Sequence, residues 1–163
     1  MDEALPADRG DGQPPAEQLR DLVETIVDGL GIDAAVDLDE DEETLTATIE
    51  GEELGIVIGR HGQTIDAIQH LAQRVVLRDR SVHKAIVVDA AGYRDRRRAT
   101  LNAQADAAAE EAVRHGRPVS LDAMNPGERR IVHERLRDRL DVETYSEGSE
   151  PDRHLVVAPV IER

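Results

Sequence analysis

The 163-residue sequence contains no cysteine, no tryptophan and no phenylalanine, and only two tyrosines, Tyr93 and Tyr145. Without cysteine the chain can form neither a disulfide nor a thiolate zinc site. Because these two tyrosines are the only large aromatic residues in the sequence, any hydrophobic core must be built mainly from aliphatic side chains. No apolar run approaches the roughly 18 residues of a membrane span, and the acidic start MDEALPADRG lacks the basic and apolar segments of a signal peptide. We therefore expect a soluble, cytoplasmic chain without membrane insertion.

Positive charge is also scarce, because 20 Lys and Arg face 35 Asp and Glu, for a net charge of −15. Like-charged polymers repel, so this total argues at first against a nucleic-acid ligand. The charge is unevenly distributed, however. Residues 1–53 hold 18 Asp and Glu but two Arg, whereas residues 54–100 hold nine Lys and Arg against four Asp and Glu. Because charges more than about 8 Å apart are largely screened at physiological salt, the middle third is the candidate surface for an anionic ligand.

The hydrophobic periodicity predicts an α+β fold of two small domains after a disordered acidic tail at residues 1–15. The first domain, residues 16–90, is expected to run helix, strand, strand, helix, helix, strand. Its strands are predicted at Ala34–Leu38, Thr44–Ile49 and Val82–Asp89. The continuous apolar run in the last of these indicates a central position in the sheet.

The second domain, residues 91–163, is expected to have the order α-β-α-β-β. An alanine-rich helix is predicted over residues 93–115 and a short strand over 119–121. Asn125 and Pro126 form an N-terminal signal for a helix that reaches about Leu140. A closing hairpin is predicted from residues 141–146 and 154–158.

The motif Gly59-Arg60-His61-Gly62 lies between the two middle helices of the first domain. Glycine permits the φ values that a tight corner needs, and a missing Cβ lets a phosphate chain approach closely. The N–H groups at the start of the next helix favour an anion there. No G-K-[ST] follows the glycines, so a Walker-type nucleotide loop is excluded. An ordinary helix–turn–helix corner remains the alternative.

With its flanking Ile58, Ile65 and Ile68, this motif resembles a KH domain of type II, with the order αββααβ, over about residues 17–89. The resemblance implies a groove for about four single-stranded nucleotides. Gly59–Gly62 would clamp their backbone, and the three isoleucines would support the groove. Such a groove works without aromatic platforms, which fits the composition. A KH fold kept for protein contacts is the alternative.

A second motif begins at Arg129, four residues before His133, so both lie on one face of a helix. Taken alone, this spacing is common on a solvated charged face. The wider segments Met124–His133 and Thr144–Arg153 resemble an R-three-H domain, in the version found after a KH domain in bacterial Jag (SpoIIIJ-associated, KhpB-type) proteins. The resemblance implies binding of single-stranded RNA, or single-stranded DNA, with protein contacts as the alternative. The candidate RNA-binding residues in this domain are Arg129, Arg130, His133 and Arg153.

This resemblance also implies a biological role. It implies an RNA chaperone or post-transcriptional regulator linked to cell-wall and cell-shape control. The sequence itself has no H-x-x-x-H metal pair, no nucleophile elbow and no nucleotide loop with its lysine, so we expect no enzyme, cofactor or metal. Members of the family pair with a small single-KH protein, so such a partner is implied here. Many members carry a further N-terminal domain and a basic linker. Only an acidic tail of about 15 residues precedes the KH unit here, so we expect the N-terminal Jag domain, and roles that depend on it, to be absent. A protein-interaction adaptor is the competing function.

Four arginines crowd the first turns of the alanine-rich helix: Arg94, Arg96, Arg97 and Arg98. Cations at this end oppose the helix dipole and cost about 0.3–1 kcal/mol each. We interpret the cluster as a phosphate-facing surface between the two domains. Ion pairs with Asp89, Asp95 or the acidic first third are the alternative.

Overall fold

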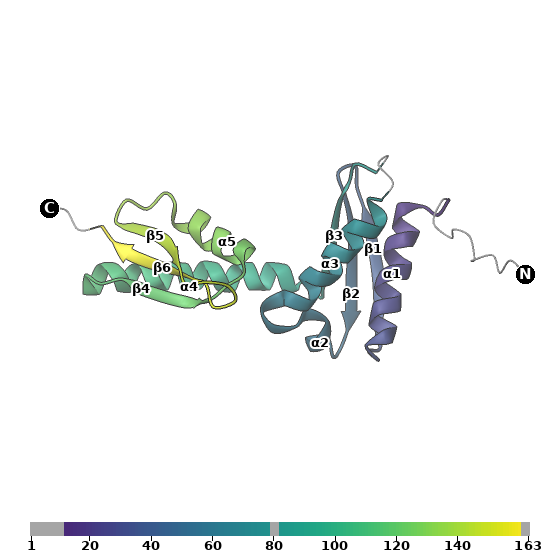
Figure 1. Ribbon diagram of the computed structural model, residues 1–163, viewed down its shortest axis with the longest axis horizontal. Helices are drawn as coiled ribbons and strands as arrows, with labels where there is room; N and C mark the ends of the chain where they lie inside the picture. Colours follow the sequence, from purple (N-terminus) through teal and green to yellow (C-terminus); the bar gives the residue numbers. More distant parts are fainter. Residues whose placement is uncertain (1–11, 79–81, 161–163) are drawn as a thin grey trace, which may run out of the picture. The chain divides into compact units, whose positions relative to one another are not determined.

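The computed structural model describes residues 12–78 and 82–160. They form two compact units, one ending at Tyr93 and the other beginning at Arg94 (Figure 1). Each unit combines helices with one three-stranded sheet, which confirms the predicted α+β fold. Residues 1–11 of the predicted tail lie outside the described residues. Within the described ranges, no helix is both long and apolar enough to cross a membrane.

The first unit has the predicted element order αββααβ, with one added turn of 3-10 helix in the loop. Strand β2 pairs antiparallel with β1 and parallel with β3. A parallel pair needs a crossover connection, and here the crossover contains the glycine motif. The elements are α1 (Pro15–Gly29), β1 (Ala34–Glu40), β2 (Thr44–Gly51), α2 (Gly55–Ile58), η1 (Arg60–Gly62), α3 (Gln63–Val76) and β3 (Ala85–Ala90).

The core of the first unit lies between one face of the sheet and helices α1 and α3 (Figure 1). The side chains of β2 alternate, so that Leu45, Ala47 and Ile49 are buried while the intervening threonines are half-buried. The buried stripes of both helices close on this face. The crossover therefore sets α3 on a fixed support, with its N-terminus at the glycine motif.

The predicted central position of the third strand is wrong. The strand order is β1-β2-β3, so β2 is central and β3 is an edge strand among the described residues. In β3, Ile86 and Val88 are buried, whereas Ala85 is exposed and Val87 is half-buried. The apolar run was misleading because β-branched residues suit a pleated strand surface even when only one face is covered.

The second unit has the predicted order α-β-α-β-β, and its central strand is β6, which pairs antiparallel with both neighbours. Its core joins the alanine-rich side of α4 to α5 and β6. The residues of α4 in this core are Leu101, Ala105, Ala108, Ala109 and Ala112. The elements are α4 (Tyr93–His115), β4 (Val119–Ala123), α5 (Pro126–Leu136), β5 (Val142–Glu147) and β6 (His154–Pro159).

Helix α5 begins where the sequence predicts but ends earlier. The side chain of Asn125 accepts the N–H of Glu128 at 2.9 Å, and the carboxylate of Glu128 accepts the N–H of Asn125 at 3.2 Å, which forms a capping box. The helix stops at Leu136 rather than near Leu140. No buried position continues its apolar side, since Leu140 is 92% exposed.

Candidate nucleic-acid interface

The loop Gly59–Gly62 has an unusual backbone, because three of its four residues have positive φ. Gly59 (φ 71°, ψ −179°) lies in a region that is essentially restricted to glycine. Gly62 (φ 78°) and His61 (φ 53°) are left-handed. Histidine, asparagine and aspartate are the non-glycine residues most often found in that region. The amino acids of the loop therefore match the shape that it adopts.

Both glycines are also required by close packing. A Cβ on Gly59 would collide with the side chain of Thr64 and lie 2.9 Å from its backbone nitrogen. A Cβ on Gly62 would lie 2.7 Å from Cε1 of Tyr93. The backbone of the loop thus lies directly against α3 and the Tyr93 ring, which leaves no room for larger residues at either end.

The loop presents positive charge to solvent. Because the N-cap residue Gly62 has no side chain, no N-cap side chain satisfies the N–H groups in the first turn of α3. A 14-residue helix carries roughly +0.5 charge at this end. Arg60 is exposed beside it, and His61 is half-buried. Backbone donors and a guanidinium therefore meet at one corner, an arrangement suited to a phosphate.

The apolar residues around the loop differ in their accessibility. Ile65 is fully buried in the first core, so it can support the loop but cannot contact a ligand. Ile58 is half-buried. Ile56 of α2 is 62% exposed, and the sequence pattern did not single it out. Its position in a four-residue helix gives too little periodicity to predict which side faces solvent.

Helix α5 and strand β5 enclose a second candidate site, a groove of about 330 Å³. It brings together Arg129, Arg130 and His133, whereas Arg153 is not part of its lining. The sequence did not indicate that residues Thr144–Ser146 form the facing wall, because only tertiary packing brings β5 beside α5. The full lining is Pro126, Arg129, Arg130, His133, Thr144, Tyr145, Ser146 and Leu155.

Two residues of this groove point polar groups to solvent. His133 is exposed, and its Nδ1 shares a 2.5 Å hydrogen bond with the hydroxyl of Thr144, which leaves Nε2 outside that bond. The side chain of Arg130 is 79% exposed, and its Nε donates to Glu134 at 2.8 Å. This contact raises the pKa of Arg130 and lowers the pKa of Glu134. Both side chains remain accessible to a ligand.

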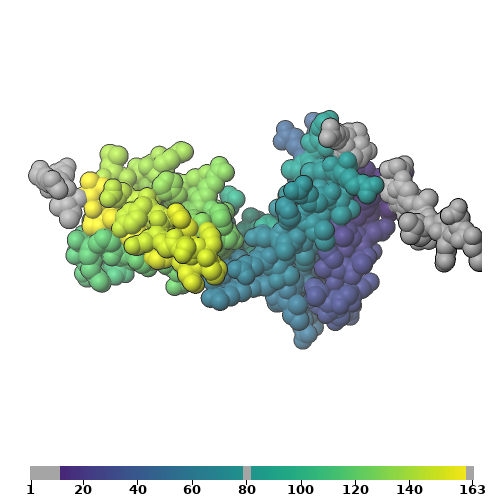
Figure 2. Space-filling model, viewed as in Figure 1, coloured from purple at the N-terminus to yellow at the C-terminus, as the bar shows by residue number. Residues whose placement is uncertain are grey.

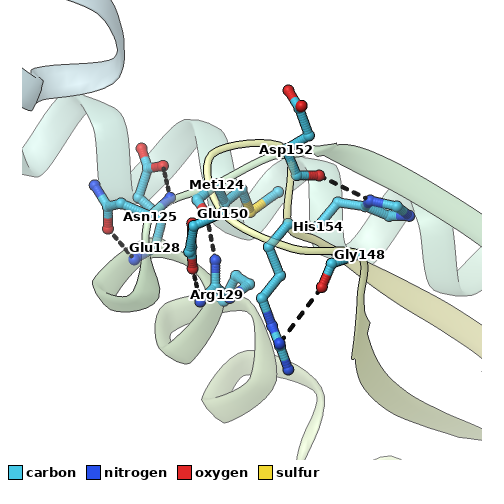
Figure 3. Close-up of polar contacts among 9 residues, drawn as sticks. Met124, Asn125, Glu128, Arg129, Gly148, Glu150, Asp152 and His154 are labelled. Atoms are coloured by element: carbon cyan, nitrogen blue, oxygen red, sulfur yellow. Dashed lines mark hydrogen bonds and ion pairs between the residues drawn. The ribbon is translucent and has the colours of Figure 1, made fainter.

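Arg129 is held by the protein itself (Figure 3). Its Nη1 donates to the backbone oxygen of Met124 at 2.5 Å, and its Nη2 donates to Oε1 of Glu150 at 2.7 Å. The side chain is 11% exposed. Arg153 is engaged more weakly, since its Nη1 donates to the oxygen of Gly148 at 3.4 Å. The arginine and the histidine of the second motif therefore have different surroundings.

The four arginines of α4 also differ among themselves. Arg97 donates from Nε to Glu128 at 2.7 Å, and the two side chains are 21% and 7% exposed. Glu128 is the one buried charged residue in the part of the chain that the structure describes. Arg94, Arg96 and Arg98 are partly or fully exposed. The pKa of Glu134 is lowered chiefly by Arg130, with a smaller contribution from Arg98.

We expect Arg97→Gln to lower the free energy of unfolding by about 1–3 kcal/mol, because it leaves the Glu128 carboxylate buried with weakened hydrogen bonding. Arg98→Gln, one residue along the same helix, is expected to change it by less than about 0.5 kcal/mol, as surface substitutions usually do. Urea unfolding followed by circular dichroism compares the two variants. Equal stabilities would show that the Arg97–Glu128 pair does not stabilise the second unit.

A wider hollow of about 780 Å³ lies at one end of the first sheet, but its charge does not suit a nucleic acid. Its lining includes Asp33, Glu50, Glu52 and Glu53 and no lysine or arginine. Four carboxylates would repel a phosphate backbone. Among residues 12–78 and 82–160, no group of three or more His, Asp and Glu is placed to hold a metal ion.

Comparison with known proteins gives matches in both units. Residues 16–89 match the family described as the KH domain of KhpA/KhpB, and residues 99–159 match the R-three-H domain. RNA-binding protein KhpB of Bacillus subtilis (strain 168) is 31% identical over 146 residues, which cover 88% of this chain and 70% of that protein. KhpB of Clostridium symbiosum is 36% identical over 140 residues (85% and 63%), and KhpB of Lactiplantibacillus plantarum is 38% identical over 140 residues (86% and 44%). The chain thus spans about half to two thirds of the length of these last two relatives.

Proposed function

Since this chain belongs to the KhpB family, with a KH and an R-three-H domain, we propose that it binds single-stranded RNA, or in its place single-stranded DNA. The observation that carries the proposal is the loop Gly59–Gly62. This loop has a positive-φ backbone and leads directly into the N-terminus of α3. The side chain of Arg60 in the loop is exposed. The matched relatives are named RNA-binding proteins.

In this proposal the sugar-phosphate backbone of the RNA lies against the loop Gly59–Gly62. One phosphate accepts hydrogen bonds from the first-turn N–H groups of α3, where the helix dipole favours an anion. Arg60 and His61 flank the same phosphate. Ile58 and Ile65 support the surface on which the bases lie, since a KH groove holds splayed, unstacked bases.

The groove between α5 and β5 contacts a further stretch of the strand. Its accessible polar groups are the Arg130 guanidinium and Nε2 of His133, which donates in the tautomer whose Nδ1 accepts the Thr144 hydroxyl. Arg98 extends the positive surface, with Arg94 and Arg96 on the same first turns of α4. These side chains contact phosphates, so they contribute affinity without sequence preference.

The family suggests the wider role. We propose a non-enzymatic RNA chaperone or post-transcriptional regulator that acts in the cytoplasm and is linked to cell-wall and cell-shape control. A small protein with a single KH domain is its proposed partner. The competing role, a protein-interaction adaptor, predicts that the loop and the groove do not contact RNA.

Binding to a single strand is expected to be clearly tighter than binding to a duplex of the same sequence, because paired and stacked bases cannot enter a KH groove. With three or four phosphates neutralised, the logarithm of the affinity should fall with the logarithm of salt concentration with a slope of about −2 to −3. Fluorescence anisotropy with an RNA of about 20 nucleotides measures both quantities. Equal affinity for strand and duplex, or a slope near zero, would favour the adaptor.

A further inference from the structure

We infer that Arg129 is a positioning residue, which holds the α5–β5 groove in shape, and that it is not a ligand of RNA phosphate. The inference deepens the proposed function and rests on it. It assigns the two residues of the Arg-x-x-x-His motif to different tasks, with His133 facing the ligand and Arg129 facing the protein.

The two side chains of the motif each link α5 to the β5–β6 hairpin, His133 at the groove wall formed by β5 and Arg129 at the loop that follows β5. His133 reaches from α5 to Thr144 of β5 through the 2.5 Å hydrogen bond. Arg129 reaches from α5 to Glu150, in the loop after β5, at 2.7 Å. Because residues four apart share a helical face, both links leave α5 on the same side. The spacing of the motif is thus the spacing of two cross-links between α5 and the hairpin.

The loop that receives Arg129 is itself tied to the end of β4. The N–H of Met124 donates to the oxygen of Arg153 at 3.0 Å, and the N–H of Asp152 donates to the oxygen of Ser149 at 2.9 Å. Arg129 adds a contact from α5 to each partner of this link, since its Nη2 donates to Glu150 in the loop and its Nη1 donates to Met124 (Figure 3). Residues 148–152 of this loop are exposed, and their yellow atoms lie at the surface of the second unit in the space-filling view (Figure 2). Loss of Arg129 would remove the side-chain hydrogen bond that joins α5 to this loop.

A phosphate has little access to Arg129, because two of its five N–H groups already donate to protein oxygens and the side chain is largely buried. The side chain is 11% exposed, and both of its Nη atoms donate to protein oxygens. The carboxylate of Glu150 stands at one of them, so a phosphate would meet a like charge. Arg130, the next residue, is 79% exposed on the same helix. It supplies the accessible guanidinium that Arg129 does not.

A positioning role and a phosphate-binding role for Arg129 predict opposite effects of removing Glu150 on RNA affinity. If Arg129 acts through Glu150, then Arg129→Ala and Glu150→Ala should each weaken binding of a 20-nucleotide oligouridine by about three- to tenfold, equivalent to roughly 0.6–1.4 kcal/mol. The double variant should lose no more than either single variant, and the salt slope should stay unchanged. Glu143→Ala removes the same charge from β5 and should bind as well as wild type or slightly tighter. His133→Ala, tested in the intact chain, should weaken binding.

Amide hydrogen exchange of the free protein gives a second readout that does not involve RNA. Residues 148–153 should exchange faster in Arg129→Ala and in Glu150→Ala, but not in Glu143→Ala. The inference is overturned if exchange in this loop is unchanged. It is also overturned if Glu150→Ala binds as tightly as wild type or tighter while Arg129→Ala flattens the salt slope by about 0.7, the value for one lost phosphate contact.

The two claims fail in distinguishable ways. If wild type binds no single-stranded RNA, the proposed function fails, and the positioning role toward RNA fails with it even where exchange rises. If wild type binds RNA but His133→Ala and Arg129→Ala do not alter affinity, the proposed function stands on the first unit alone. The positioning role toward RNA is then overturned.

Discussion

A Gly59→Ala variant is expected to lose at least about 2 kcal/mol of stability, whereas Gly55→Ala, four residues earlier, is expected to be neutral or stabilising. At Gly59 the backbone has φ 71° and ψ −179°, a region that costs a residue with a side chain about 1–3 kcal/mol. The added Cβ would also collide with Thr64. At Gly55 nothing lies within 4 Å of the new methyl group, and alanine in a helix is favoured over glycine by about 0.5–1 kcal/mol.

Thermal unfolding followed by circular dichroism compares the two glycine variants. The two variants are well matched. Gly55 is the first residue of the short helix α2 and Gly59 is its C-cap, and each change adds a single methyl group. If Gly59→Ala melts like Gly55→Ala, the loop can relax to an ordinary backbone. The positive-φ backbone at Gly59 would then not be needed for the stability of the first unit.

The features that the sequence predicted correctly depend on neighbouring residues. The alternation of Leu45, Ala47 and Ile49 with threonines predicted a strand with one buried face, and β2 has that pattern. Asn125 followed by Pro126 predicted the start of α5, and the capping box lies there. The glycine motif predicted a sharp corner between two helices, and its three positive φ values produce that corner.

The features that the sequence missed depend on partners far apart in the chain. Glu128 pairs with Arg97, 31 residues earlier, and no local pattern indicates that pair. Glu150 receives Arg129 across 21 residues. The edge position of β3 depends on which strand it joins, and an apolar run describes burial without identifying the neighbour. Spacing therefore proposed the candidate site residues, whereas only packing separated exposed side chains from those that bind other protein groups.

Arg97 illustrates this separation within one cluster. Cations at the start of α4 oppose its dipole, and the sequence therefore favoured a phosphate-binding role for all four arginines. The structure instead pairs Arg97 with the buried Glu128. A cluster defined by composition thus contains an arginine that pairs with a buried carboxylate, together with arginines whose side chains are partly or fully exposed.

The largest effect on affinity is expected from the double variant Arg60→Asp with His61→Asp. Both glycines remain, and aspartate is among the residues that accept the left-handed conformation of His61. Two unit charges about 5 Å apart repel by roughly 0.8–3 kcal/mol at an effective dielectric of 20 to 80. Loss of the attraction from Arg60 adds a comparable amount. Since about 1.4 kcal/mol is a factor of ten, affinity for single-stranded RNA should fall at least tenfold.

The chain contains a matched control for this variant. Arg114-His115-Gly116 repeats the three residues Arg60-His61-Gly62 in an exposed position, at the end of α4. Arg114→Asp with His115→Asp makes the same change of charge away from the loop. Because these two residues are not part of the loop, we expect at most a small effect on affinity.

Binding of a 20-nucleotide single-stranded RNA to these two double variants, with their melting temperatures measured in parallel, tests the central claim most directly. We predict that the loop variant melts like wild type and binds at least tenfold more weakly, while the Arg114/His115 variant binds nearly as wild type does. A loop variant that melts like wild type and binds RNA with unchanged affinity would contradict the claim that Gly59–Gly62 is the RNA site.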